Sequence, residues 1–139
     1  MKFSYSKVLI ALLFTLSGCS MKQADPTTLV TLDQVEEAFR TEGIQLVPKQ
    51  LSDDWKIRKV KANQYVVDNT QPYDQIFIYI FASEEARKDG RKNFDKQKEK
   101  EEYNHDIYES KNVLVVYWNQ ESSKDTSFSK TAMDALHKS

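Results

Sequence analysis

The fold of this chain is decided by the stretch Gln75-Ile-Phe-Ile-Tyr-Ile-Phe81, in which β-branched and aromatic residues follow one another without polar alternation. Such residues favour an extended backbone, and a strand without a polar face is usually covered on both sides. We therefore predict a central β-strand over residues 75–81. A second stretch of the same kind, Val113-Leu-Val-Val-Tyr-Trp118, predicts another central strand.

A helix is predicted directly after the first central strand. Ser83 precedes two glutamates, and this order is typical of a helix start because the hydroxyl caps free amides and the carboxylates oppose the positive end of the helix dipole. The predicted buried line of this helix is Ala86, Gly90 and Phe94. The mixed charges of residues 95–102 predict a solvated extension of the helix that frays near Tyr103.

The C-terminal third predicts a hairpin and a last helix. The hairpin arms are residues 106–110 and 112–118, with the turn at Ser110-Lys111. Residues 119–126 form a predicted polar loop. The last helix is predicted by the helical spacing of Phe128, Ala132, Ala135 and Leu136.

The N-terminal side of the predicted sheet begins with an amphipathic helix over residues 32–42. Thr31 and Gln34 form a predicted capping box, and Gly43 marks the helix end. The apolar face of the helix is Leu32, Val35, Ala38 and Phe39. Weaker patterns predict a short strand or an extended exit at residues 44–48 and strands at residues 55–58 and 64–68, followed by a turn at residues 69–74 that contains Pro72.

This order of elements is typical of an α+β fold. We expect a single small domain over residues 31–139, with an antiparallel or mixed sheet of about four to five strands and about three helices packed on it. The content of 40% hydrophobic and 29% charged residues indicates a folded chain. The net charge of −1, which becomes −3 when residues 1–18 and their two lysines are removed, gives no indication of nucleic-acid binding. One cysteine excludes an intramolecular disulfide.

The first 18 residues have the properties of an export signal. Lys2 and Lys7 precede a nearly unbroken apolar run over residues 8–16, and two small residues follow. The run is too short to cross a bilayer, which takes ~20 residues. Residues 19–30 are polar at their start and contain Pro26, so we predict a short tether before the domain.

The segment Leu16-Ser17-Gly18-Cys19 resembles the lipobox of bacterial lipoproteins. The resemblance implies that the chain is cleaved before Cys19, that Cys19 carries a diacylglycerol with palmitate-type acyl chains, and that this lipid holds the protein on the extracytoplasmic face of the cell membrane. The layout, in which a strong strand leads into a charged helix and Asn-Val-Leu-Val-Val at residues 112–116 precedes the last helix, is similar to small lipoproteins of unknown function from Gram-positive bacteria. These relatives bring no assigned active site.

Two kinds of titratable pair are candidates for chemistry. His105-Asp106 is the one adjacent imidazole and acid, and it would serve as a base or a metal ligand, but no spacing typical of a zinc site accompanies it or His137. Asp53-Asp54 would contribute to a cation or acid/base site, and a helix start or a turn just before Trp55 explains it equally well. We interpret these residues as ordinary surface residues and expect no metal and no cofactor.

Two groups of side chains are candidates for binding. A basic cluster would face anionic head groups or wall polymer, or else guard a strand edge against pairing; it consists of Lys56, Arg58, Lys59 and Lys61. The aromatic residues would line a ligand groove, although core packing explains them as well. They are Trp55, Tyr65, Tyr73, Tyr79, Tyr103, Tyr108, Tyr117 and Trp118.

Three function classes follow from these observations. The first is a non-catalytic binding or accessory lipoprotein that contacts an envelope protein, a polymer or a small ligand. The second is a surface-tethered hydrolytic enzyme that uses His105 with a carboxylate brought near by the fold. The third is a structural or immunity-type protein that binds one specific partner protein. The sequence favours the first class and leaves the ligand, the partner and the biological process open.

Overall fold

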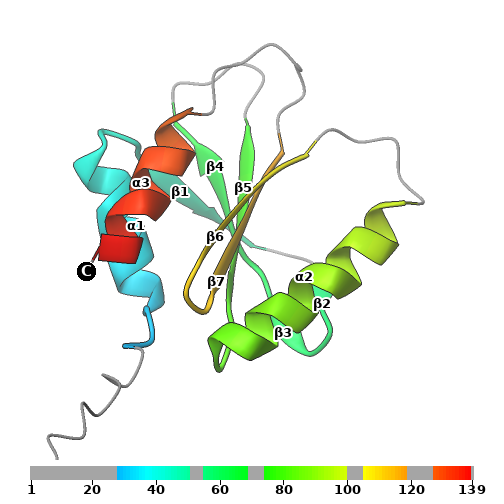
Figure 1. Ribbon diagram of the computed structural model, residues 1–139. Coiled ribbons are helices and arrows are strands. Elements are labelled where there is room, and N and C mark those ends of the chain that lie inside the picture. Colours follow the sequence, from blue (N-terminus) through cyan, green and yellow to red (C-terminus); the bar gives the residue numbers. More distant parts are fainter. Residues whose placement is uncertain (1–27, 51–54, 69–73, 100–104, 119–126, 139) are drawn as a thin grey trace, which may run out of the picture.

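The computed structural model describes residues 28–50, 55–68, 74–99, 105–118 and 127–138 (Figure 1). Within these residues the elements follow one another as α1 (Leu32–Thr41), β1 (Leu46–Lys49), β2 (Lys56–Ile57), β3 (Val60–Lys61), β4 (Asn63–Val67), β5 (Gln75–Ile80), α2 (Glu84–Lys98), β6 (His105–Ser110), β7 (Val113–Trp118) and α3 (Ser127–Lys138). The predicted α+β class is confirmed. Residues 1–27, which include the predicted signal, Cys19 and most of the predicted tether, lie outside the described residues, as does the predicted loop at residues 119–126.

The main sheet has five strands in the order β1-β4-β5-β7-β6, and all four pairings are antiparallel. Both strands that were predicted to be central lie inside the sheet and pair with each other over six residues, from Gln75 opposite Trp118 to Ile80 opposite Val113. Their continuous apolar sequence is explained by cover on both faces. The strands β2 and β3 form a separate two-stranded sheet.

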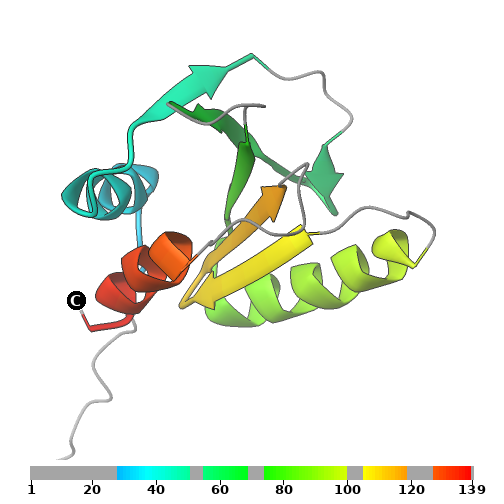
Figure 2. The same cartoon turned by 90° about the horizontal axis from the view of Figure 1, so that it is seen from above.

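The two faces of the main sheet carry different elements. Helices α1 and α3 lie on one face, and α2 lies with the small β2–β3 sheet on the other (Figures 1 and 2). Successive residues of a strand point to opposite faces. Ile76 and Ile78 therefore pack in the core under α1 and α3, whereas Phe77 and Tyr79 pack in the core under α2.

The predicted caps of α1 and α2 are both formed. The Gln34 amide donates to the Thr31 hydroxyl at 3.4 Å, and the Gln34 side chain accepts from the Thr31 amide at 2.9 Å, which completes the capping box. The Ala86 amide donates to the Ser83 hydroxyl at 3.0 Å. Helix α1 ends at Thr41, one residue before the predicted end, and Gly43 follows with φ of 76°.

Gly90 determines how closely α2 approaches the sheet. A Cβ at this position would lie 2.4 Å from Cζ of Phe81, well inside van der Waals contact. Gly90 and Phe94 are buried and Ala86 is half-buried, so the predicted line of this helix is confirmed. The helix runs to Lys98, and the remainder of its predicted extension at residues 100–103 lies outside the described residues.

The start of the domain is fixed to the turn between β6 and β7. Asn112 is buried there, its Oδ1 accepts from the Val30 amide at 2.8 Å, and its Nδ2 donates to the carbonyl oxygens of Val30 at 3.1 Å and Phe81 at 2.9 Å. The predicted arm over residues 112–118 therefore begins one residue later, because Asn112 belongs to the turn together with Lys111, whose φ is 49°.

Three sequence predictions need correction. The strand predicted at residues 55–58 contains only Lys56 and Ile57, because Arg58 has a φ of 55° and turns the chain back into β3, a strand that was not predicted. The strand predicted at residues 64–68 is shifted by one residue to Asn63–Val67. In α3 the predicted core residue Ala135 is exposed and Met133 is buried in the core with Ala132 and Leu136, while the side chain of Phe128 lies outside the described part.

Candidate functional site

The four predicted basic residues meet on one short hairpin, residues 56–61, which we call the basic hairpin. Its antiparallel register places Lys56 opposite Lys61, so both side chains lie on one face, and Ile57 opposite Val60 on the other. Ile57 is fully buried and anchors the hairpin in the core beneath α2. Arg58 and Lys59 are exposed in the turn.

The basic hairpin is not an edge of the main sheet. The edge strands of that sheet are β1 and β6, and β1 carries Pro48, which has no amide proton to offer to another strand. The strands β2 and β3 are, however, the two edges of their own small sheet, so the cluster still suits a guard against edge pairing as well as the presentation of positive charge on an exposed turn.

The predicted pair His105-Asp106 does not act as a unit. These two residues are neighbours in β6, so their side chains point to opposite faces of the strand. The imidazole of His105 lies against the rings of Phe94, at 5.9 Å and nearly perpendicular, and of Trp118, at 5.8 Å. His137 is exposed on α3, far along the chain.

No group of three or more histidine, cysteine, aspartate or glutamate side chains with metal-binding geometry exists among the described residues. The predicted candidates Asp53 and Asp54 lie outside that part of the chain.

An aromatic cluster covers the α2 side of the sheet next to the basic hairpin. Trp55 stacks on Phe77 with ring centroids 4.9 Å apart, and Trp118 lies 5.8 Å from Trp55 and 6.4 Å from Phe77. Phe77 is fully buried, whereas both tryptophans are half-buried. Each tryptophan therefore packs against the core with one part of its ring and leaves the other part at the surface.

A concave site of about 270 Å³ opens beside this cluster, and we call it the aromatic pocket. Four segments build it: the approach to the basic hairpin, β5, the C-terminal half of α2, and the start of β6. It is lined by Trp55, Lys56, Ile57, Tyr79, Phe94, Gln97, Lys98 and His105. Three of these residues, Ile57, Tyr79 and Phe94, are buried, and the lysines and Gln97 form a polar rim. None of the lining residues that the structure describes is acidic.

The three buried tyrosines of the sheet differ in what their hydroxyls contact. The Tyr117 hydroxyl donates to the buried carboxylate of Asp74 at 2.6 Å, and the Tyr65 hydroxyl donates to Glu36. Burial first, and the carboxylate partner second, raises the pKa of both phenols well above the ordinary value. Burial alone raises the pKa of Tyr79 to about 12.

The Tyr79 hydroxyl makes no hydrogen bond with any other described residue, although the side chain is only 2% exposed. Because Tyr79 lines the aromatic pocket, the pocket contains a hydroxyl donor that the described part of the protein leaves without an acceptor. The ring is buried, but the hydroxyl itself opens onto the pocket, because the fully buried polar atoms without a partner in the described part are the Ser110 and Ser129 hydroxyls. Of the aromatic residues considered for a ligand groove or for the core, Tyr65 and Tyr117 are core residues, Tyr79 is a core residue that also lines the pocket, and Trp55 lines the pocket. Tyr73 and Tyr103 lie outside the described residues.

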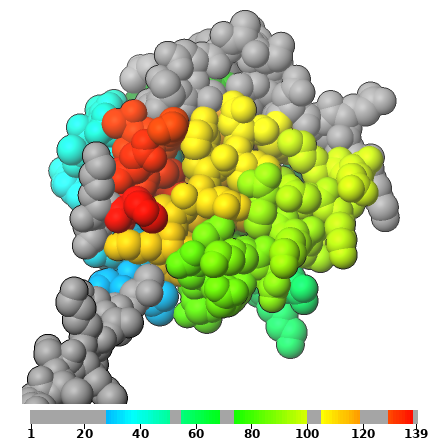
Figure 3. Space-filling view, viewed as in Figure 1, coloured from blue at the N-terminus to red at the C-terminus, as the bar shows by residue number. Residues whose placement is uncertain are grey.

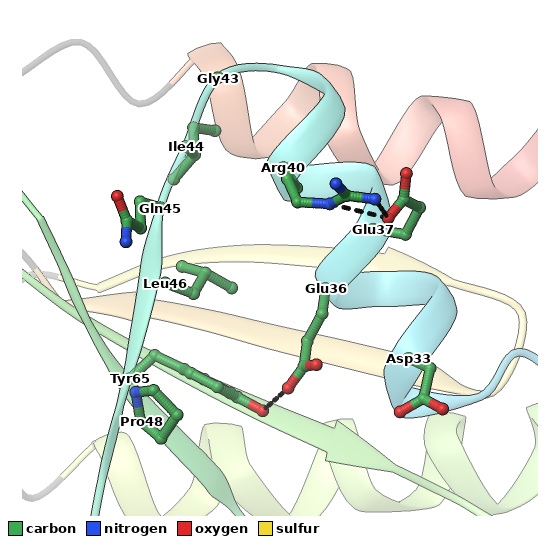
Figure 4. Close-up of a pocket in the computed structure, with 10 residues that line it drawn as sticks. All are labelled: Asp33, Glu36, Glu37, Arg40, Gly43, Ile44, Gln45, Leu46, Pro48 and Tyr65. Atoms are coloured by element: carbon green, nitrogen blue, oxygen red, sulfur yellow. Dashed lines mark hydrogen bonds and ion pairs between the residues drawn. The ribbon is translucent and has the colours of Figure 1, made fainter.

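A second hollow, of about 560 Å³, lies between α1 and the strands β1 and β4, and Figure 4 shows its lining. Four of its polar residues pair with one another: Glu36 reaches across to accept from Tyr65, and Glu37 is paired with Arg40 along the helix. We interpret this acidic groove as the place where α1 is fastened to the sheet.

The pocket was only partly visible in the sequence. Trp55, Lys56, Tyr79 and His105 were candidates for separate reasons, while Gln97, Lys98, Phe94 and Ile57 carried no functional signal of their own. In the described part of the chain, no helix has both the length and the apolar character needed to cross a membrane. No protein-family model, no curated protein and no solved structure matches this chain.

Proposed function

We propose that this chain is an extracytoplasmic lipoprotein, held on the cell membrane by a lipid on Cys19, and that it works as a non-catalytic binding module rather than as an enzyme. The lipobox at residues 16–19 supports the proposed location on the membrane. The position of the basic hairpin supports the binding role. The partner would be an anionic surface of the envelope, either lipid head groups or an anionic polymer.

The observation that carries the proposal is that the chain enters the domain at the end of the molecule where the basic hairpin turns. Val30 is bonded to Asn112 in the β6–β7 turn, and this turn and the β2–β3 turn lie at the same end of the sheet (Figure 1). In the space-filling view the hairpin projects beyond α2 at that end (Figure 3). The domain start and the hairpin turn, which carries Arg58 and Lys59, therefore lie at the same end of the molecule, although α1 and the hairpin cover opposite faces of the sheet (Figures 1 and 2).

The length of the tether keeps this end close to the bilayer. Residues 19–29 span at most about 40 Å when fully extended and about 18 Å as a flexible chain. A basic side chain near an anionic bilayer contributes about 1 kcal/mol, and this attraction decays over about 8 Å at physiological ionic strength. Two exposed cations on the tip of the hairpin would thus orient a domain that the lipid already holds at the surface.

The test compares two double variants in a Cys19→Ala chain that lacks residues 1–18. One variant carries Arg58→Glu and Lys59→Glu; the control carries Lys92→Glu and Lys96→Glu, which change the net charge equally at exposed positions of α2. Binding to vesicles is measured by sedimentation, with phosphatidylglycerol present or absent. We expect the hairpin variant to lose about tenfold or more of its affinity for the anionic vesicles, and the control to lose clearly less. Equal losses in both variants would contradict the proposed role of the hairpin.

The two other function classes receive no specific support from the geometry. In the described part of the chain, no carboxylate lines the pocket that contains His105, so these residues do not supply the acid that a His105-based hydrolase needs there. A single tight protein partner would be recognised by stoichiometric co-purification from crosslinked membranes.

A further inference from the structure

We propose that the aromatic pocket binds a small organic anion, with an apolar ring against the pocket floor and a carboxylate or phosphate group that accepts from the Tyr79 hydroxyl. The lysines of the rim, Lys56 and Lys98, supply the opposite charge. This binding site lies apart from the tip of the basic hairpin and does not depend on the lipid on Cys19. It is therefore tested separately from the proposed function.

The first support is the unpartnered donor. The Tyr79 ring is buried, but its hydroxyl opens onto the pocket and has no hydrogen-bond partner among the described residues, so its proton can be donated to a bound ligand. The two other buried tyrosines of the sheet each donate to a carboxylate, Tyr117 to Asp74 and Tyr65 to Glu36. Tyr79 has the same burial but opens onto a cavity. An oxyanion in the cavity would give Tyr79 the kind of partner that its two neighbours already have.

The second support is the charge of the lining. Within the described ranges of the chain, the lining holds two ammonium groups, one imidazole and one carboxamide, and it holds no carboxylate. A ligand group with oxygen acceptors and negative charge finds donors from several directions there. A cationic ligand would meet like charge and the partly positive edges of aromatic rings from these described residues.

The third support is the size and the floor of the pocket. A cavity of 150 Å³ is enough for benzene in an engineered protein core, so about 270 Å³ accommodates one ring with a charged substituent. Ile57 and Phe94 provide buried apolar contact, and Trp55 offers an aromatic wall. The apolar part of the ligand is needed because two rim lysines alone would hold a free anion weakly in water.

The test uses phenyl phosphate as the probe, with inorganic phosphate and benzyl alcohol as controls that retain only the anion or only the ring. Binding to the mature chain is followed by tryptophan fluorescence and by backbone and indole amide shifts in NMR spectra. We expect saturable binding of phenyl phosphate with a dissociation constant on the order of 1 mM or lower, and clearly weaker binding of both controls. Shifts should centre on Trp55, Gln97 and His105.

Three variants locate the site. Tyr79→Phe removes only the hydroxyl and should weaken phenyl phosphate binding about tenfold, and Lys98→Gln should weaken it severalfold. Tyr65→Phe removes a sheet hydroxyl on the opposite face and should leave the affinity unchanged. The proposal is wrong if phenyl phosphate gives no saturable shift, or if inorganic phosphate or benzyl alcohol binds as tightly as phenyl phosphate. It is also wrong if Tyr79→Phe and Lys98→Gln bind phenyl phosphate as tightly as the unchanged chain.

Discussion

Replacing each of the three buried sheet tyrosines by phenylalanine should change the free energy of unfolding in three different ways. The change is the same in each case, one hydroxyl oxygen, and the burial is similar, because Tyr65, Tyr79 and Tyr117 are 4%, 2% and 1% exposed. What differs is the partner. The comparison therefore separates the hydrogen bond from the packing of the ring.

The expected magnitudes follow from these partners. Tyr117→Phe removes a 2.6 Å bond to Asp74, a carboxylate that is only 1% exposed and would be left poorly solvated, so the loss should be about 1.5–3 kcal/mol. Tyr65→Phe removes a bond to Glu36, which is half-buried and can turn to water, and should cost about 0.5–1.5 kcal/mol. Tyr79→Phe removes a hydroxyl without a partner among the described residues and should range from no change to a gain of about 1 kcal/mol.

The assay is urea unfolding of the mature chain, monitored by tryptophan fluorescence and by circular dichroism. The urea concentration at the midpoint of unfolding should fall clearly for Tyr117→Phe, fall slightly for Tyr65→Phe, and stay or rise for Tyr79→Phe. The dependence of the free energy of unfolding on urea concentration should be unchanged in all three variants. A loss for Tyr79→Phe as large as that for Tyr117→Phe would refute the reasoning, because the Tyr79 hydroxyl would then have a partner inside the folded protein.

Three further predictions concern the helix contact, the domain start and the response to pH. Gly90→Ala should destabilise the chain by about 1–3 kcal/mol in a chemical-denaturation experiment, opposite to the usual effect in a helix, because the new Cβ would collide with the ring of Phe81. Asn112→Ala removes three hydrogen bonds, two of them to Val30, and should cost about 3 kcal/mol and speed hydrogen exchange of the Val30 amide. Above about pH 10 the free energy of unfolding should fall, because the pKa of Tyr79 is about 12 in the folded chain and its ordinary value is 10.0, so the unfolded state loses this proton first. This one group lowers the free energy of unfolding by up to about 1.4 kcal/mol per pH unit. Tyr79→Phe should show a smaller dependence of stability on pH, measured by chemical denaturation at several pH values.

The sequence was most informative where local chemistry and burial agree. The run at residues 75–81 and the run at residues 113–118 hold apolar residues on both faces, and both strands lie inside the sheet with helices on one side and a helix with a hairpin on the other. Ser83 and the Thr31 capping box act within three residues of the helix starts, so no tertiary information was needed to predict them.

The basic hairpin was not predicted, because its turn lacks the residues that usually mark one. Arg58 adopts a φ of 55° without glycine, asparagine or aspartate, which are the common residues at such positions. The buried Ile57, packed beneath α2, holds the hairpin in place, and this contact is tertiary. Ala135 was wrongly predicted to be a core residue for a similar reason. Its spacing fits the buried face of the helix, but the packing of α3 in the fold leaves it exposed.

The aromatic pocket was beyond sequence reasoning as a unit. Its residues come from segments up to 50 positions apart, between Trp55 and His105, and only the antiparallel order of the sheet and the angle of α2 bring them together. The sequence identified His105 by its chemistry and Trp55 by its size. It gave no signal that Lys98 and Tyr79 would meet at the same cavity.

The most direct test of the proposed lipoprotein function is intact mass spectrometry of the protein extracted from membranes, beside a Cys19→Ala variant. We expect a chain that begins at Cys19 with the added mass of a diacylglycerol, and a variant that is neither lipidated nor retained in the membrane fraction. A full-length chain that still carries residues 1–18, or a chain with an unmodified Cys19 in the same fraction, would contradict the proposed function.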